Sequence, residues 1–280
     1  MKTIREENIG KSIVRLLKTA TGFAGIVLSG SGRSEPRFGE DADELWKELV
    51  ADLNKVHPDY FGYPGAKIRF LKLFPGGLAD PQFRKFERDY KVAARELLVS
   101  TVPLDKATSA TEEHCGLIAK VFAKTNMLSQ FEHARVREVL KSRHGPAFIS
   151  GAAAMATGCL GPGLKAVSES MKDFGQLSWP AATYLPFLWE PDTQMFLKPE
   201  VTKDFADRVG HPFARTYSAR LDPEVYESLL DLARETTEEI ASLKPVDRID
   251  IQSFIWVVGA YKDSDPEEQR AQLKGKPLPS

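Results

Sequence analysis

Four basic residues spaced as a stripe along one predicted helix are the first candidates for binding chemistry. Asp80-Pro81 has the form of a helix start, and the helix it predicts runs to about Val99. At about 100° per residue, the basic residues share a face that is distinct from the apolar face. They are Arg84, Arg88, Lys91 and Arg95. A stripe of one charge sign predicts a phosphate-binding face. The alternatives are a solvated face or a set of ion-pair partners for acidic helices nearby.

Other segments with suggestive residue types fail on spacing. The glycine-rich residues 29–34 lack the pattern of a phosphate loop, so we expect a mobile linker there. The histidines of residues 114–144 have no Cys, Asp or Glu partner at a recognised metal-binding spacing. Two cysteines, Cys115 and Cys159, are too few for a four-thiolate site. We therefore expect no metal site and no cofactor.

Residues 174–210 form the predicted centre of the core. Ser178-Trp179-Pro180 and Lys198-Pro199-Glu200 each have the form of a capping residue followed by proline, which predicts two helix starts. The second helix ends at Gly210. Large aromatic residues concentrate in this stretch and in the last predicted helix. We expect six of them to be largely buried: Trp179, Tyr184, Phe187, Trp189, Phe205 and Trp256.

Gly175-Gln176-Leu177-Ser178 is a glycine-bearing turn, and Ala181-Ala182-Thr183 supplies small residues to the helix that follows. Phe196-Leu197 is a short apolar segment that leads to the next helix start, where Lys198 stands. This layout resembles the helix-hairpin-helix DNA glycosylase superfamily, which has a catalytic aspartate at the position of Lys198. The resemblance implies an α-helical fold that faces DNA, with Gly175, Gln176 and Ser178 at the phosphates. It also implies glycosylase-like chemistry that is altered or absent.

Lys198 is the candidate nucleophile if this region carries out a reaction, because an amine with a lowered pKa can attack a sugar carbon. Asp204 or Glu200 would then serve as the acid or base. The alternative for Lys198 is a surface lysine before a helix cap. The chain as a whole also resembles uncharacterised bacterial helical proteins, a likeness that implies no mechanism.

Helical periodicity recurs along the chain, and no segment alternates convincingly as a strand. The sequence therefore predicts an all-α, compact multi-helix domain, as one unit or as two packed helical halves. We expect an N-terminal helix in residues 1–28, a linker at 29–40, a helical core at 41–262 and a disordered tail at 263–280.

The formal net charge of -1 over 280 residues argues against binding to nucleic acid by bulk charge, but it allows a local basic patch. No secretory signal is apparent, and no run approaches the roughly 20 apolar residues of a membrane span. The composition therefore predicts a cytoplasmic protein without membrane contact.

Three functions are compatible with these features. The basic stripe and residues 174–210 favour a nucleic-acid-binding helical protein. A protein–protein adaptor without enzymatic activity is the alternative, favoured by the balanced charge and the acidic helix predicted at 222–243. A small-molecule enzyme with a pocket near Asp250, Gln252 and Trp256 is the third. If the stripe gathers beside the Gly175 turn, nucleic acid is favoured; if it lies apart, the adaptor is favoured.

Overall fold

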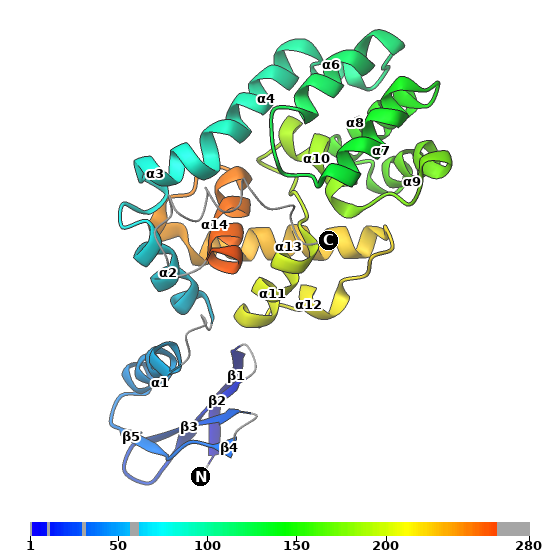
Figure 1. Cartoon of the computed structure of the whole chain (residues 1–280). Coiled ribbons are helices and arrows are strands. Elements are labelled where there is room, and N and C mark those ends of the chain that lie inside the picture. Colours follow the sequence, from blue (N-terminus) through cyan, green and yellow to red (C-terminus); the bar gives the residue numbers. More distant parts are fainter. Residues whose placement is uncertain (1, 10–11, 30–31, 57–61, 262–280) are drawn as a thin grey trace.

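The computed structural model describes residues 2–9, 12–29, 32–56 and 62–261 (Figure 1). A small sheet with one helix lies at one end of the molecule, and a larger helical body makes up the rest. The mainly helical character predicted from the sequence is confirmed. The strict all-α expectation is wrong for residues 2–39, where the chain forms strands. The predicted tail at 263–280 lies outside the described residues.

The N-terminal unit is a five-stranded antiparallel sheet, in place of the helix and linker expected there. β2 pairs with β1 on one side and β3 on the other, and β3 also pairs with β4 and β5. The strands are β1 (Lys2–Ile9), β2 (Ser12–Lys18), β3 (Phe23–Ser29), β4 (Gly32–Arg33) and β5 (Arg37–Gly39). The expected linker at 29–40 therefore contains two short strands.

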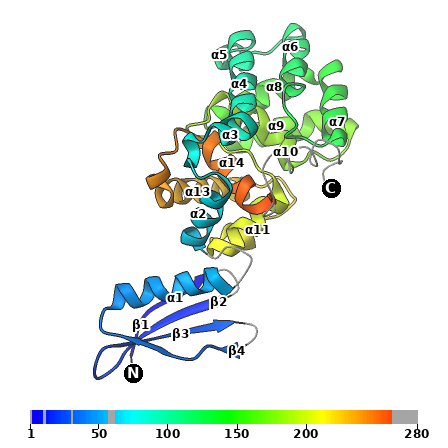
Figure 2. The same cartoon turned by 60° about the vertical axis from the view of Figure 1, so that its left-hand side comes forward.

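Helix α1 (Ala42–Val56) covers one face of this sheet (Figure 2). Its Leu45 and Leu49 are buried in one cluster with Val14 and Leu16 of β2. The helix begins as predicted, because the Asp41 carboxylate accepts hydrogen bonds from the backbone N–H groups of residues 43 and 44. Burial of alternate residues in β2 is the period-2 pattern of a half-buried strand.

The helical body follows the predicted helices closely. Its elements in chain order are α2 (Gly62–Leu73), η1 (Gly77–Ala79), α3 (Pro81–Phe83), the π-helical turn η2 (Arg84–Arg88), α4 (Asp89–Thr101), α5 (Leu104–Ala107), α6 (Glu112–Phe122), α7 (Gln130–Lys141), α8 (Gly145–Ala156), α9 (Leu160–Met171), η3 (Lys172–Phe174), α10 (Trp179–Trp189), α11 (Pro199–Val209), α12 (Phe213–Thr216), α13 (Pro223–Glu239), η4 (Ala241–Leu243) and α14 (Arg248–Ala260). Side chains cap two of the predicted starts, Asp80 at α3 and Ser178 at α10, and Asp247 caps α14.

Gly210 ends α11 in the left-handed conformation, with φ 83°. A Cβ atom at this position would lie 2.4 Å from the backbone oxygen of Asn8 in β1. Glycine therefore serves two purposes here, since it closes the helix and allows the end of β1 to approach it.

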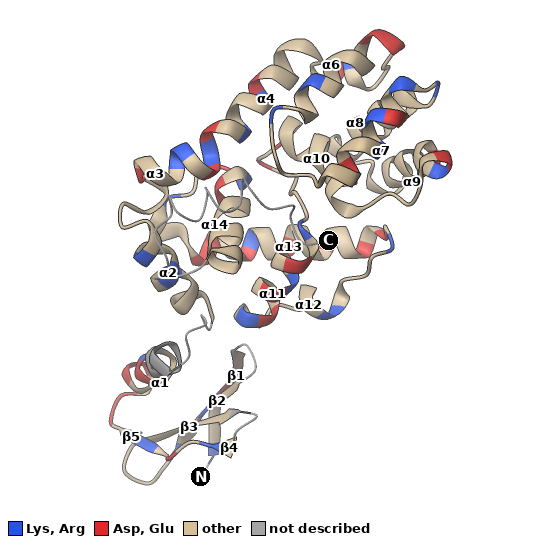
Figure 3. Cartoon of the chain, viewed as in Figure 1, with Lys and Arg blue, Asp and Glu red and all other residues tan. Residues whose placement is uncertain are grey.

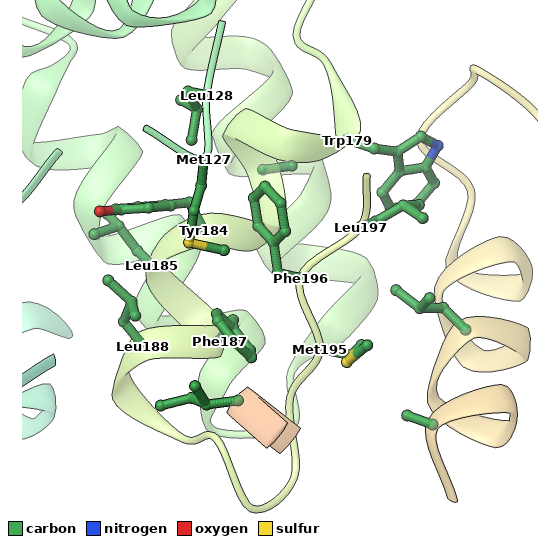
Figure 4. Packing of buried hydrophobic residues seen from close by; sticks show 14 of the residues in the cluster. Met127, Leu128, Trp179, Tyr184, Leu185, Phe187, Leu188, Met195, Phe196 and Leu197 are labelled. Carbon is green, nitrogen blue, oxygen red and sulfur yellow. The ribbon is translucent and has the colours of Figure 1, made fainter. Parts of the chain in front are cut away.

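Helix α10 is the centre of the body, because every one of its residues is buried. Phe196 of the connector after α10 packs against Tyr184 and Phe187, with ring centroids 6.4 and 6.1 Å away (Figure 4). The Nε1–H group of Trp189 donates to the backbone oxygen of Val102, so the indole buries no unpaired donor. Five of the six aromatic residues expected in the core are fully buried, and Trp256 is partly buried against it.

No helix in the described part of the chain is long and apolar enough to cross a membrane.

Candidate functional site

The basic stripe predicted to bind phosphate turns largely inward. Arg88 Nη1 lies 2.8 Å from Asp247 Oδ1 and 2.7 Å from Asp250 Oδ1, both at the start of α14. Burial opposes the charge of Arg88, but the hydrogen bond with Asp247 and the charge of Asp250 raise the pKa of the guanidinium overall. Burial also raises the pKa of Asp250, against the pull of Arg88. Arg88 is thus an internal ion-pair partner of α14.

Lys91 is still more enclosed, with 1% of its surface exposed. Its Nζ donates to Ser253 Oγ at 2.7 Å and lies 3.5 Å from Glu87 Oε2. The Tyr261 hydroxyl donates to the other oxygen of Glu87 at 2.7 Å. The structure therefore places Lys91 in a satisfied polar cluster inside the protein, where a phosphate has no access.

The two ends of the stripe differ from its middle. Arg84 is exposed and lies 3.7 Å from Asp89. Arg95 is partly buried, and its buried Nε has no hydrogen-bond partner among the described residues. Acidic and basic residues both occur along α4 and α7, whereas α13 is acidic apart from Arg234 (Figure 3). The ion-pair alternative considered for the stripe describes Arg88 and Lys91, which pair with Asp247, Asp250 and Glu87.

A hollow of about 540 Å³ lies where helices α7, α10 and α11 begin. We call it the first hollow. Its walls combine aromatic and aliphatic side chains with a few polar groups, which is typical of a small-molecule site. The lining residues are Ser129, Glu132, Arg135, Gln176, Leu177, Ser178, Trp179, Pro180, Lys198, Pro199, Glu200, Val201, Tyr217, Ala219 and Trp256.

Glu132 ties two of the converging helix starts together. Its Oε2 accepts from the backbone N–H of Ser129 at 2.8 Å, in a capping box at the start of α7. Its Oε1 accepts from the hydroxyl of Ser178, the cap of α10, at 2.5 Å. A single carboxylate thus fixes both helix starts at the wall of the first hollow.

Lys198 occupies the capping position of α11, but its side chain does not cap that helix. Its Nζ donates to the backbone oxygen of Met127 at 3.3 Å. Burial lowers the pKa of Lys198, and the negative charge of Glu132 partly opposes that shift. A larger fraction of this amine is therefore neutral near pH 7 than for a solvated lysine.

Arg135 of α7 lies against the Gly175 turn. Its Nη1 donates to the backbone oxygen of Gln176 at 3.3 Å. Gly175 has φ 104°, and a Cβ there would lie 3.4 Å from Arg135 Nε. The glycine therefore supplies both the backbone conformation of the turn and the space for the guanidinium.

The first hollow gathers part of the site expected from the sequence. Gln176, Ser178 and Lys198 line it together with Glu200, the alternative acid or base. Asp204 does not line it, because its carboxylate pairs with Arg208 at 2.8 Å one turn further along α11. Gly175 supports the turn without lining the first hollow.

Sequence reasoning missed Glu132 and Arg135. The Ser129-x-x-Glu132 spacing is a capping-box pattern, and that signal is visible in the sequence. Nothing in the spacing places that capping box beside Lys198. Of the residues proposed for a third site, only Trp256 lines this hollow, because Asp250 is held by Arg88.

Among the described residues, no group of three or more His, Cys, Asp and Glu side chains is placed to hold a metal ion. Comparison with family models, with curated proteins and with solved structures finds no match to this chain.

Proposed function

We propose that the chain binds a small organic molecule in the first hollow and that the Lys198 amine reacts with a carbonyl group of that molecule. One observation carries the proposal: a lysine with a lowered pKa lines a hollow with mostly apolar walls. Desolvation in such a site is a known way to activate a lysine nucleophile. A perturbed titratable group in a cleft is itself a marker of function.

The neutral Lys198 amine attacks the carbonyl carbon and forms a carbinolamine. Loss of one water molecule then gives an imine, so the carbonyl oxygen leaves as water and no oxidant or reductant is needed. Glu132 lines the same hollow and is suited to accept and return the proton. The aromatic side chains of Tyr217 and Trp256 favour a ligand with a planar apolar part.

Reductive trapping tests this chemistry. The protein is incubated with benzaldehyde, an imine is reduced with borohydride, and the modified lysine is located by peptide mass spectrometry. We expect preferential modification of Lys198 and its loss in Lys198→Met. Lys141→Met is the matched control, because Lys141 is exposed and does not line the first hollow. Modification spread evenly over exposed lysines would contradict the proposal.

A second candidate is binding of nucleic acid that carries an aldehyde, such as an abasic sugar in its open form. The specific observation in its favour is that Gln176 and Ser178 of the hairpin-like turn line the first hollow together with Lys198. The same trapping experiment with an abasic single-stranded oligonucleotide tests it. A protein–DNA adduct that requires Lys198 favours nucleic acid, whereas an adduct with benzaldehyde alone favours the small molecule. A helical adaptor without enzymatic activity would give neither.

A further inference from the structure

A second hollow of about 490 Å³ borders the Gly175 turn. Gln176 and Leu177 line both hollows, so the turn forms a shared wall. The lining residues of the second hollow are Ser168, Lys172, Gly175, Gln176, Leu177, Arg220 and Leu221. The two hollows are therefore neighbours at this turn.

The lining of the second hollow carries two positive charges and no carboxylate. Lys172 Nζ lies 3.9 Å from Glu169, and Arg220 Nε lies 3.2 Å from Asp222. The side chains of Lys172 and Arg220 are 71% and 82% exposed, so these ion pairs contribute little to stability. Both cations can thus turn from a solvated carboxylate towards a ligand at a small cost in free energy.

The first hollow has a different character, with aromatic walls from Trp179, Tyr217 and Trp256. We infer that the two hollows form one elongated site for an organic phosphate, with the aromatic part in the first hollow and the phosphate between Lys172 and Arg220. Arginine and lysine are the side chains that bind phosphate oxygens through charge-assisted hydrogen bonds. The inference rests on the proposed function only in taking the first hollow as the ligand site.

Adenosine and adenosine 5′-monophosphate (AMP) form a probe pair that differs only in the phosphate. Isothermal titration calorimetry at low salt should show AMP binding about tenfold more tightly than adenosine. The double variant Lys172→Gln with Arg220→Gln should bring the affinity for AMP down to that for adenosine and leave adenosine unchanged. Equal affinities for the two probes in the wild-type protein would overturn the inference, and so would no binding by either.

The matched control is Lys141→Gln with Arg84→Gln. Lys141 is 65% exposed and lies 3.6 Å from Glu138, and Arg84 is 60% exposed beside Asp89, so this pair reproduces the surroundings of Lys172 and Arg220 elsewhere on the surface. We expect the control to keep the affinity for AMP. An equal loss in the control would show a general effect of net charge and would overturn the inference.

The phosphate can belong to a mononucleotide or to a nucleic-acid strand. A short single-stranded oligothymidylate with and without a 5′-phosphate separates these sources. Binding of AMP alone identifies a free nucleotide, whereas tight, salt-dependent binding of both strands identifies a nucleic acid. Neither adenosine nor AMP has a free carbonyl group, so their binding is independent of imine formation. Loss of trapping at Lys198 and loss of phosphate recognition are therefore separate results.

Discussion

Lys91 and Lys198 lie in two regions of the helical body, and each is a lysine whose charge is removed from bulk water. Each ammonium group has a carboxylate in its surroundings, Glu87 for Lys91 and Glu132 for Lys198. Lys91 is enclosed by α4 and α14, with a hydroxyl acceptor and an ion pair within the protein. Lys198 has one backbone acceptor and lines the first hollow. The packing around each charge therefore decides whether it is enclosed in the protein or lines a hollow.

The two lysines differ in their surroundings because different parts of the helices pack around them. The π-helical turn and α4 lie along the start of α14, so side chains from both close over the charges. At Lys198, the starts of three helices converge. The first N–H groups of each helix have no hydrogen-bond partner within that helix. Capping side chains such as Ser178 satisfy some of these groups but do not fill the space between the helices.

Among the variants considered, Arg88→Ala is expected to lower the free energy of unfolding most. It leaves Asp247 and Asp250 near each other without their common cation, and Asp250 is 2% exposed. Removing one partner of a buried ion pair costs about 3–5 kcal/mol in free energy of unfolding. Urea unfolding followed by circular dichroism measures this loss. Arg84→Ala, in an exposed pair of the same stripe, should cost less than about 0.5 kcal/mol. Equal costs at the two positions would mean that the inward arrangement is wrong.

Part of the helical body was predictable because some helix starts are marked locally. Asp80-Pro81 and Ser178-Trp179-Pro180 each give the correct start of a helix. The sheet was missed because apolar runs in β2 and β3 are short. In residues 12–18 the apolar residues stand at positions 13, 14, 16 and 17, which is the spacing of a helical face and not the alternation of a strand. The pairing with β1 and β3, which decides between them, is a tertiary contact that local spacing does not encode.

The candidate site was predictable only in part. Lys198, Gln176 and Ser178 were identified from the stretch that forms two helix starts. Glu132 comes from a helix start about 46 positions earlier, and its link to Ser178 depends on how α7 packs against α10. The stripe was expected on one helical face, but the structure leaves Arg84 exposed and turns Arg88 and Lys91 towards α14.

Chemical labelling compares the two lysines directly. Partial acetylation with acetic anhydride at pH 8, followed by peptide mass spectrometry, reports the reactivity of each amine. We expect Lys198 to react about tenfold faster than Lys91, because its neutral form is favoured and it lines an open hollow. Lys91, with 1% of its surface exposed, should react more slowly in the folded protein than after unfolding in urea. Similar acetylation rates at the two residues in the folded protein would contradict the difference in enclosure between Lys91 and Lys198.

Glu132→Gln should lower the free energy of unfolding less than Arg88→Ala does, and it should also change the pKa of Lys198. The variant weakens the hydrogen bonds to Ser129 and Ser178, and loss of one capping interaction costs about 1 kcal/mol. It also removes the negative charge that raises the pKa of Lys198, so that pKa should fall further. The pH profile of Lys198 acetylation should therefore move to lower pH. Glu138→Gln, at an exposed pair on the same helix, is the control. An unchanged profile in Glu132→Gln would show that its charge does not reach Lys198.

The smallest effect is a pH-dependent change in stability for Lys198→Met. The folded-state pKa of Lys198 lies below its ordinary value of 10.5, so between these two pH values the unfolded chain binds more protons than the folded chain. The free energy of unfolding of the wild-type protein therefore rises with pH across that window, as the cost of burying the charge is relieved. The methionine variant lacks this cost. Its stability relative to wild type should be highest below the folded pKa and should decline towards pH 10.5. Urea unfolding at several pH values measures the difference, with Lys141→Met as the exposed control. If the difference in free energy of unfolding between variant and wild type stayed constant with pH, the pKa of Lys198 would be the same in the folded and unfolded chains. Lys198 would then be solvated, contrary to its placement in the first hollow.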